Sequence, residues 1–316
     1  MIERNRNHPV ISKKKYLMQE KKILFIINPI SGGKNKDFLP DLIRSTINNN
    51  IPYDILEWQS ASQDIEKEIS KKIEEENFNI LVAAGGDGTI NRMASFVKGK
   101  NITLGILPFG SGNGLARFLK IPLTTEKAID LILTGKEVII DSGKINDKDF
   151  FCTAGVGFDA HIGALFAKAG KRGPMTYIKK ITSEFNKYKP SLYNLEIDGK
   201  TYSEEAFLIT FANANQWGNE AQIAPGADIQ DGFLNITLIK SVSLLSAPVI
   251  ASRLYLKNIH KSEDVITFAG KKIVVKREED GPVHFDGDPG MMGKEITVEI
   301  CPASLRIIVP SKSLLK

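Results

Sequence analysis

The sequence predicts an α/β domain followed by an antiparallel β-rich, sandwich-like domain, and three observations support this fold class. In the first half, short apolar runs end in glycine-rich turns and are followed by helical patterns, as in a parallel sheet. In the second half, alternating strands dominate. A chain of 316 residues also exceeds what one core usually organises. We therefore expect a basic, disordered tail over 1–21, an α/β domain over 22–141, a β-rich domain over 142–304 and a last strand over 305–310 that can return to the first domain.

The first expected strand is the apolar run 23–27, which leads into the turn Asn28-Pro29-Ile30-Ser31-Gly32-Gly33-Lys34. This turn is not a Walker A loop, because Asn28 stands at the position of its first glycine and Asn35 at the position of its Ser/Thr. A strand, a glycine turn and a following helix still predict a phosphate-facing loop. Lys34 is a candidate contact in it.

The most informative stretch is 79–91, where an apolar run ends in Gly85-Gly86-Asp87-Gly88-Thr89. Glycines let backbone N–H groups approach an anion, and the N-terminus of the following helix adds partial positive charge. Asp87 would repel a phosphate unless a cation lies between them, which indicates Mg²⁺ or a proton-accepting role. The alternative is a β-to-α turn that uses glycine only for tightness.

A third expected strand, 103–107, runs into the glycine-rich loop 108–117. Ligands of open α/β sheets bind outside the carboxyl ends of the strands, so three such loops at one edge predict a binding site there. The other helices expected in this domain are 36–48, 62–76, one that follows the Gly85 loop and ends at about 97, and 125–133. The other expected strands are 53–58 and 138–141.

The second domain is expected to be mostly strands with two helices. The Asp198-Gly199 pair predicts a hairpin turn. The expected helices are 175–187 and 244–256, and the expected strands are 193–197, 206–212, 233–239, 272–277, 295–300 and 305–309.

Composition excludes several classes of protein. Hydrophobic content of 42% and charged content of 25% are ordinary for a globular protein, and no apolar run approaches the ~20 residues of a membrane span. The basic N-terminus is not followed by an apolar segment, so we expect no secretory signal. The two cysteines, Cys152 and Cys301, have no partners at metal-ligand spacing, and a reduced cytoplasm fits them best.

The net charge of +5 is distributed unevenly. Residues 1–22 carry seven Lys/Arg against two Glu, and residues 168–190 carry seven against one Glu. Local basicity argues against a protein coated for nucleic acid and indicates one or two patches that meet an anionic surface. Solvated charge runs are the alternative interpretation.

Five motifs together resemble the catalytic domain family of diacylglycerol kinases, which also contains soluble bacterial lipid kinases and the sphingosine and ceramide kinases. They are Asn28 to Gly33, Gly85 to Thr89, Leu107 to Asn113, Gly155 to Ala160 and Asp286-Gly287-Asp288. The resemblance implies a Rossmann-like domain similar to those of 6-phosphofructokinase and NAD kinase, a β-rich lipid domain, and ATP in the cleft between them. The residues that it assigns to the nucleotide are Asn28, Pro29, Ser31, Gly32, Gly33, Ser60, Gly85, Gly86, Asp87, Gly88, Thr89, Asn91, Gly110, Ser111 and Asn113.

The resemblance also implies catalytic and metal-binding carboxylates. In the family a carboxylate of an Asp-Gly-Glu motif is the general base, which maps to Asp286 with Asp288 as helper or competitor. Asp87 completes the catalytic set. A structural Mg²⁺ in related bacterial enzymes maps to Asp231 with Asp228 and Phe233, although a plain turn before a strand is the alternative there.

The expected activity is ATP- and Mg²⁺-dependent phosphorylation of a membrane lipid hydroxyl by a cytoplasmic, peripheral enzyme. Many bacterial diacylglycerol kinases read Gly-Thr-x-Asn-Asp where this chain has Gly110-Ser111-Gly112-Asn113-Gly114, a form more similar to sphingosine and ceramide kinases. Diacylglycerol-like and sphingoid-like acceptors therefore both stay open. The alternatives are an NAD kinase and a non-catalytic nucleotide- or lipid-binding regulator, and a homodimer is considered as an assembly.

Overall fold

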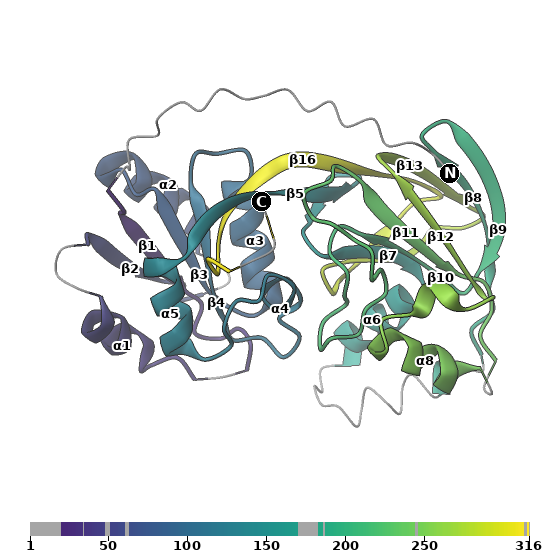
Figure 1. Ribbon diagram of the computed structural model, residues 1–316, viewed down its shortest axis with the longest axis horizontal. Helices are drawn as coiled ribbons and strands as arrows, with labels where there is room; N and C mark the ends of the chain where they lie inside the picture. The colour runs from purple at the N-terminus through teal and green to yellow at the C-terminus, as the bar shows by residue number, and fades with distance from the viewer. Residues whose placement is uncertain are drawn as a thin grey trace.

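The computed structural model describes residues 20–33, 35–47, 51–60, 63–169, 183–185, 187–243, 246–312 and 315 (Figure 1). The basic tail up to residue 19, Lys34 and most of the basic segment 168–190 lie outside these residues, and so do the predictions made for them.

The first domain is built on a parallel sheet in the strand order β2-β1-β3-β4. The strands are β1 (Ile23–Ile27), β2 (Tyr53–Glu57), β3 (Ile80–Gly85) and β4 (Thr103–Pro108). Every residue of β1, β3 and β4 is buried, as expected for central parallel strands covered on both faces. The α/β alternation predicted from the apolar runs is confirmed.

Five helices are described in this domain, three between successive strands and two after β4, and in Figure 1 α2 and α3 lie on one face of the sheet while α1 and α5 lie on the other. They are α1 (Leu39–Thr46), α2 (Ile65–Glu76), α3 (Asp87–Val97), α4 (Gly114–Phe118) and α5 (Thr125–Thr134). α3 follows directly from the glycines after β3, so its N-terminus faces the carboxyl edge of the sheet.

Two long strands join the domains, β5 (Lys136–Ile145) and β16 (Glu295–Val309). β16 pairs with β4 at one end and with β13 at the other, so one ten-stranded sheet runs through both domains. The sequence predicted two strands where β16 is continuous, because a bulge between Cys301 and Leu305 interrupts the pattern without ending the strand. The expected boundary at residue 142 falls inside β5.

The second domain is a sandwich of two antiparallel layers, as the sequence predicted. The first layer continues the long sheet with β13 (Lys272–Arg277), β8 (Ser191–Ile197) and β9 (Lys200–Ala206), and β6 (Lys148–Phe150) pairs with β5. The second layer has the order β12 (Val265–Gly270), β11 (Leu234–Ile239), β10 (Leu208–Ala212), β7 (Thr153–Gly157), β14 (Gly281–Phe285) and β15 (Asp288–Met292).

The strand predicted at 206–212 is in fact two strands in different layers. β9 ends at Ala206 in the first layer, and β10 begins at Leu208 in the second. Phe207 lies between them and donates its N–H to the carbonyls of Ile239 and Lys240. The apolar run continues through this change of layer, which explains why the sequence pattern did not reveal it.

Helices α6 (Phe158–Ala169) and α8 (Ala247–Tyr255) and the 3₁₀ turn η1 (Ile259–Lys261) cover the outer face of the second layer. Of the helix predicted at 175–187, only residues 183–185 are described as helical. No helix within the described residues is long and apolar enough to cross a membrane.

Candidate active site

The loops after β1, β3 and β4 converge at one edge of the sheet, as their positions predicted. The side-chain amide of Asn28 donates to the Thr89 hydroxyl at 3.0 Å. The N–H of Gly86 donates to the Ser31 hydroxyl at 3.2 Å. Side chains of the first loop therefore hold the backbone of the second.

Glycine is required where these loops cross. Gly32 has φ of +71°, and a Cβ there would lie 2.4 Å from the carbonyl oxygen of Phe109. At Gly110 a Cβ would lie 2.8 Å from a carboxylate oxygen of Asp87. A larger residue at Gly32 would push the first and third loops apart, and one at Gly110 would displace the Asp87 carboxylate of the second loop.

Asp87 joins the second loop to the third. One of its carboxylate oxygens accepts from the N–H of Asn113 and the other from the N–H of Gly114, both at 3.0 Å. These N–H groups open α4, so the carboxylate occupies the N-terminal end of that short helix. Asp87 therefore fixes the shape of the Gly110 loop and also faces the space between the domains.

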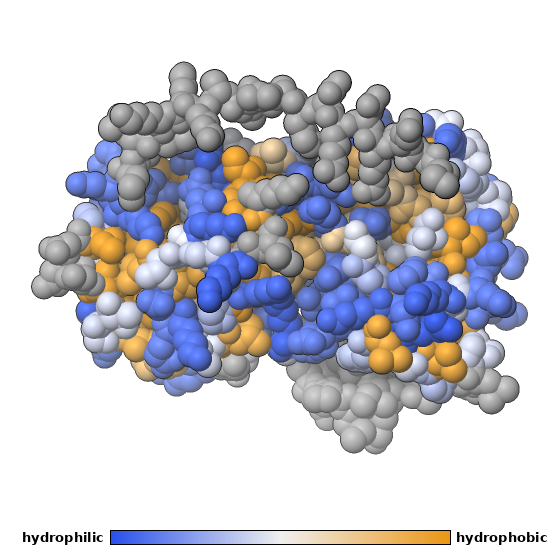
Figure 2. Space-filling view, viewed as in Figure 1, coloured by the Kyte–Doolittle hydropathy of each residue, from blue (hydrophilic) through white to orange (hydrophobic). Residues whose placement is uncertain are grey.

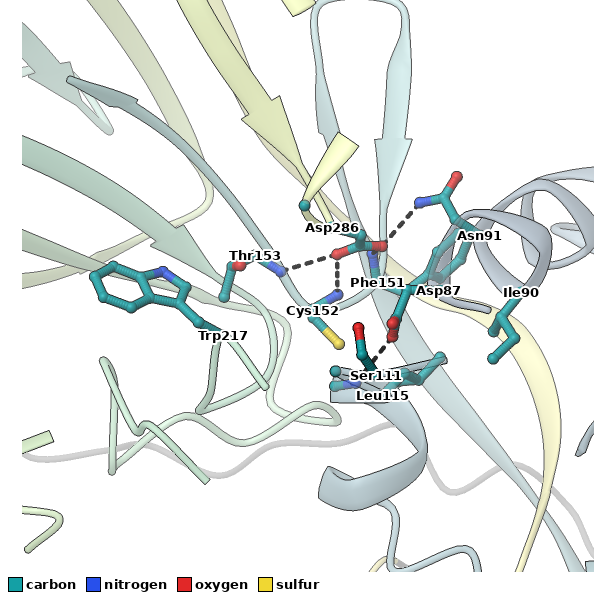
Figure 3. A pocket seen from close by; sticks show the side chains of 13 residues that line it. Asp87, Ile90, Asn91, Ser111, Leu115, Phe151, Cys152, Thr153, Trp217 and Asp286 are labelled. Carbon is teal, nitrogen blue, oxygen red and sulfur yellow. Dashed lines mark hydrogen bonds between the residues drawn. The ribbon is translucent and has the colours of Figure 1, made fainter. Parts of the chain in front are cut away.

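That space is a cavity of about 200 Å³ between the domains. Of the residues assigned to nucleotide or catalysis from the sequence, it brings together Asp87, Asn91, Ser111 and Asp286 (Figure 3). The remaining lining residues are Ile90, Gly112, Gly114, Leu115, Phe151, Cys152, Thr153, Trp217 and Gly287.

The Asp286 carboxylate lies at the second-domain side of this cavity and accepts four hydrogen bonds. One oxygen accepts from the N–H of Cys152 at 2.7 Å and of Thr153 at 3.0 Å. The other accepts from the N–H of Phe151 at 2.7 Å and from the amide of Asn91 at 2.8 Å (Figure 3). Burial raises the pKa of Asp286, and the hydrogen bonds oppose that rise.

Asn91 thus has a contact that the sequence did not reveal. It was assigned to the nucleotide, and its amide spans the domains, donating to Asp286 and, at 3.3 Å, to the carbonyl of Asp149. This bond ties α3 to the segment that follows β14.

Asp288, two residues further on, is placed differently. A Cβ at Gly88 would lie 3.3 Å from one of its carboxylate oxygens, so the side chain faces the start of α3. Partial burial and then the charge of Asp87 raise the pKa of Asp288. Among the described residues its carboxylate has no hydrogen-bond partner, in contrast to Asp286.

Ser60 and the expected metal residues lie away from the cavity. Ser60 follows β2 at the edge of the sheet, where its carbonyl accepts from the Trp58 indole. A carboxylate oxygen of Asp228 accepts from the N–H of Gln230, and one of Asp231 accepts from the N–H of Phe233. The described residues contain no group of three or more His, Cys, Asp or Glu arranged to hold a metal, and the Mg²⁺ assigned to this turn stays a prediction.

Several functional positions were missed by sequence reasoning. Phe151 to Thr153 supply the N–H groups that hold Asp286, and Trp217 lines the opposite part of the cavity. His284, on the strand that leads to Asp286, pairs with Asp159 of α6 at 2.9 Å. None of these contacts has a local signal in the sequence, because each joins segments that meet only in the folded sandwich.

Two family models match the chain. The diacylglycerol kinase catalytic domain matches residues 22–145. The YegS C-terminal NAD kinase beta sandwich-like domain matches residues 152–309. The two matches divide the chain where β5 and β6 connect the domains.

Relatives support the same assignment. An uncharacterised protein of Synechocystis is 30% identical over 307 residues, covering 90% of this chain and 69% of that protein. The "probable lipid kinase YegS-like" of Klebsiella pneumoniae is 28% identical over 239 residues, covering 74% of this chain and 79% of that protein. A crystal structure of a diacylglycerol kinase from Bacillus anthracis has the same fold, with a TM-score of 0.69 and 20% identity over 93% of this chain and 98% of the other.

The fold and the interdomain cavity define a two-domain kinase. The chain belongs to the diacylglycerol kinase catalytic domain family, in the lipid kinase group that carries the YegS type of C-terminal domain.

Proposed function

We propose that the protein transfers the γ-phosphoryl group of ATP to the hydroxyl group of a membrane lipid. The observation that supports this most is the composition of the cavity. The loops after β3 and β4 line one side of it and are held by the loop after β1, and Asp286 and Gly287 line it from the sandwich domain, with Asp288 next to them facing the start of α3. Phosphoryl transfer needs this pairing of a phosphate site with a proton acceptor.

The N-terminal side is proposed to hold ATP. The N-terminus of α3 offers backbone N–H groups and partial positive charge to phosphate oxygens. The side-chain oxygens of Asn28 and Asn113 are buried without a hydrogen-bond partner, which leaves acceptors available in the same loops.

Mg²⁺ is proposed to accompany the nucleotide at Asp87, which lines the cavity at the start of α3. Its carboxylate oxygens are donors of the kind that suits a hard cation. When bound, Mg²⁺ would offset the negative charge of the transferring phosphoryl group.

Asp288 is the proton acceptor that the geometry favours. The attacking lipid hydroxyl must lose its proton as its oxygen bonds to the γ-phosphorus and ADP leaves. Asp288 has unused lone pairs to take that proton, whereas Asp286 would have to give up one of its four hydrogen bonds. Asp286 remains the alternative acceptor, and its raised pKa is compatible with that role.

Radiolabelled ATP incubated with diacylglycerol, sphingoid base, ceramide, phosphatidylglycerol or NAD tests the proposal. NAD belongs in the panel because the C-terminal domain matches a model described as NAD kinase-like. We expect label in one lipid and none in NAD. Label in NAD alone, or release of ADP that no acceptor increases, would contradict a lipid kinase.

A further inference from the structure

Helix α8 presents a row of apolar side chains to solvent. Val249, Tyr255 and Leu256 are 53%, 60% and 68% exposed. Their spacing places them on one face of the helix, together with the exposed residues Pro248 and Ser252. The opposite face is anchored by Ile250, which is 7% exposed and belongs to the core cluster under α8.

This concentration distinguishes α8 from the rest of the described surface. The other large apolar side chains that are as exposed, Ile30 at 74% and Met291 at 69%, stand singly, in the loop after β1 and in β15. Single exposed apolar residues are normal on a protein surface, whereas a row of them on one helix marks an interaction site.

The charged residues of α8 and of the segment that follows it up to Ser262 are all basic. Residues 241–262 contain Arg253, Lys257 and Lys261 and no Asp or Glu. Figure 2 shows apolar side chains in orange over α8 with hydrophilic side chains next to them. An amphipathic helix with basic residues beside an apolar face is the pattern of helices that lie in the surface of an anionic bilayer.

The position of α8 relative to the cavity strengthens this interpretation. The carbonyl of Leu254, at the end of α8, accepts from the N–H of Gln222. The same short loop places Trp217 in the cavity, with the Trp217 N–H donating to the carbonyl of Ala221. One loop therefore connects the C-terminal end of α8 with a residue that lines the cavity.

We propose that this α8 surface, formed by Pro248, Val249, Ser252, Tyr255 and Leu256 with Arg253, Lys257 and Lys261, docks onto an anionic lipid bilayer. The inference rests on the proposed function, since a lipid kinase must meet its acceptor at a membrane. A protein partner is disfavoured because a stable protein interface buries about 800 Å² per partner, more than one nine-residue helix face supplies.

Co-sedimentation with vesicles tests the docking surface. The full-length protein is mixed, without ATP, with vesicles of equal parts phosphatidylglycerol and phosphatidylcholine, or with vesicles of phosphatidylcholine alone. We expect binding to the first and much weaker binding to the second. The double variant Val249→Asp/Leu256→Asp should lower binding by about tenfold or more, and Lys257→Gln/Lys261→Gln by about fivefold per charge removed.

Leu192→Asp, which adds one negative charge at an exposed leucine on β8, is the control for a surface aspartate elsewhere and should leave binding unchanged. Equal binding by wild type and Val249→Asp/Leu256→Asp would overturn the proposal. So would conversion of a wild-type dimer to a monomer by that variant with no loss of vesicle binding, because α8 would then pack against a second copy.

A second assay separates failure of this proposal from failure of the proposed function. Phosphorylation of a short-chain acceptor dispersed in water should be the same in wild type and Val249→Asp/Leu256→Asp, while phosphorylation of acceptor embedded in anionic vesicles should fall. Equal phosphorylation of vesicle-embedded acceptor by wild type and the variant, together with equal vesicle binding, would refute the α8 docking surface and leave the lipid kinase function standing. No phosphorylation of any lipid by wild type, together with vesicle binding that Val249→Asp/Leu256→Asp abolishes, would refute the lipid kinase function and leave the α8 docking surface standing.

Discussion

The N-terminal side of the cavity and its C-terminal side differ in how far along the chain their polar contacts reach. On the N-terminal side, the bonds among the Asn28, Gly86 and Asn113 loops join residues 26 to 61 positions apart. On the C-terminal side, Asp286 is held by residues 133 to 195 positions away. The first side is shaped by neighbouring strands of one sheet, and the second requires the whole sandwich to close.

The comparison extends to the carboxylates. The carboxylate oxygens of Asp87 and Asp286 accept hydrogen bonds from backbone N–H groups, and these bonds fix the shape of the cavity walls. Asp288 does not, and it faces the start of α3. We infer that Asp87 and Asp286 fix the shape of the cavity walls, whereas Asp288 accepts the proton of the lipid hydroxyl.

Replacing Asp288 should affect turnover and little else. Asp288→Asn is expected to lower kcat by about 10²–10⁴, the usual contribution of a general base. No folded-state hydrogen bond is lost, so the thermal midpoint should not fall. Steady-state assays and thermal unfolding check this, with Glu279→Gln as an exposed control. An unchanged kcat would exclude Asp288 as the proton acceptor.

Replacing Asp286 should affect stability. Asp286→Ala leaves the N–H groups of Phe151, Cys152 and Thr153 without their acceptor. Each unpaired buried donor costs about 1–3 kcal/mol, so the free energy of unfolding should fall by about 3 kcal/mol or more. Urea unfolding measures the loss, and Asp286→Asn, which keeps one acceptor oxygen, should lose less. A loss below about 1 kcal/mol would show that these bonds do not support the fold.

The N-terminal side offers a matched glycine pair. Gly32 and Gly33 both have positive φ, but only Gly32 would place a Cβ against the backbone of Phe109. Gly33→Ala should therefore cost about 1–2 kcal/mol of backbone strain alone. Gly32→Ala should cost more and raise the KM for ATP, because the loops must separate. Equal effects on stability and KM would mean that the close approach of the loops is not needed.

The acid-side fall of kcat/KM should occur at a higher pH than the ordinary pKa of an aspartate would give. The pKa of Asp288 is raised above its ordinary 3.8, so kcat/KM should fall on the acid side with a midpoint above that value. In the same window the folded state binds more protons than the unfolded state, so this group's contribution to stability decreases as pH rises through its folded pKa. The measurement is a pH profile of kcat/KM together with urea unfolding over the same range. A midpoint at or below 3.8 would contradict the environment described for Asp288.

The fold and the N-terminal side of the cavity could be predicted from the sequence because their signals are local. The apolar run before Gly85, the glycines and the helix after them follow one another along the chain, and parallel strands place such turns at one edge. The sequence did not predict that β16 is one strand through both domains, because the bulge between Cys301 and Leu305 has the pattern of a strand end.

The C-terminal side was only partly predictable. Family resemblance marked Asp286, but the four donors around it and the Asp159–His284 pair depend on which strands become neighbours in the sandwich. Trp217 lies in a loop whose sequence has no periodicity to mark it, and the cavity alone shows its place. The sequence predicted a helix over 244–256, and its exposed apolar row appeared only when each side chain was placed.

The proposal that the loops of one domain and Asp288 of the other act on the same phosphoryl transfer is tested most directly by one reaction, in which ADP and phosphorylated lipid are measured together for wild type and Asp288→Asn. We predict that the two products form one to one in wild type, only when lipid acceptor is present, and that both fall together in Asp288→Asn. ADP formed without phosphorylated lipid, or an unchanged yield of both products in Asp288→Asn, would contradict the proposal.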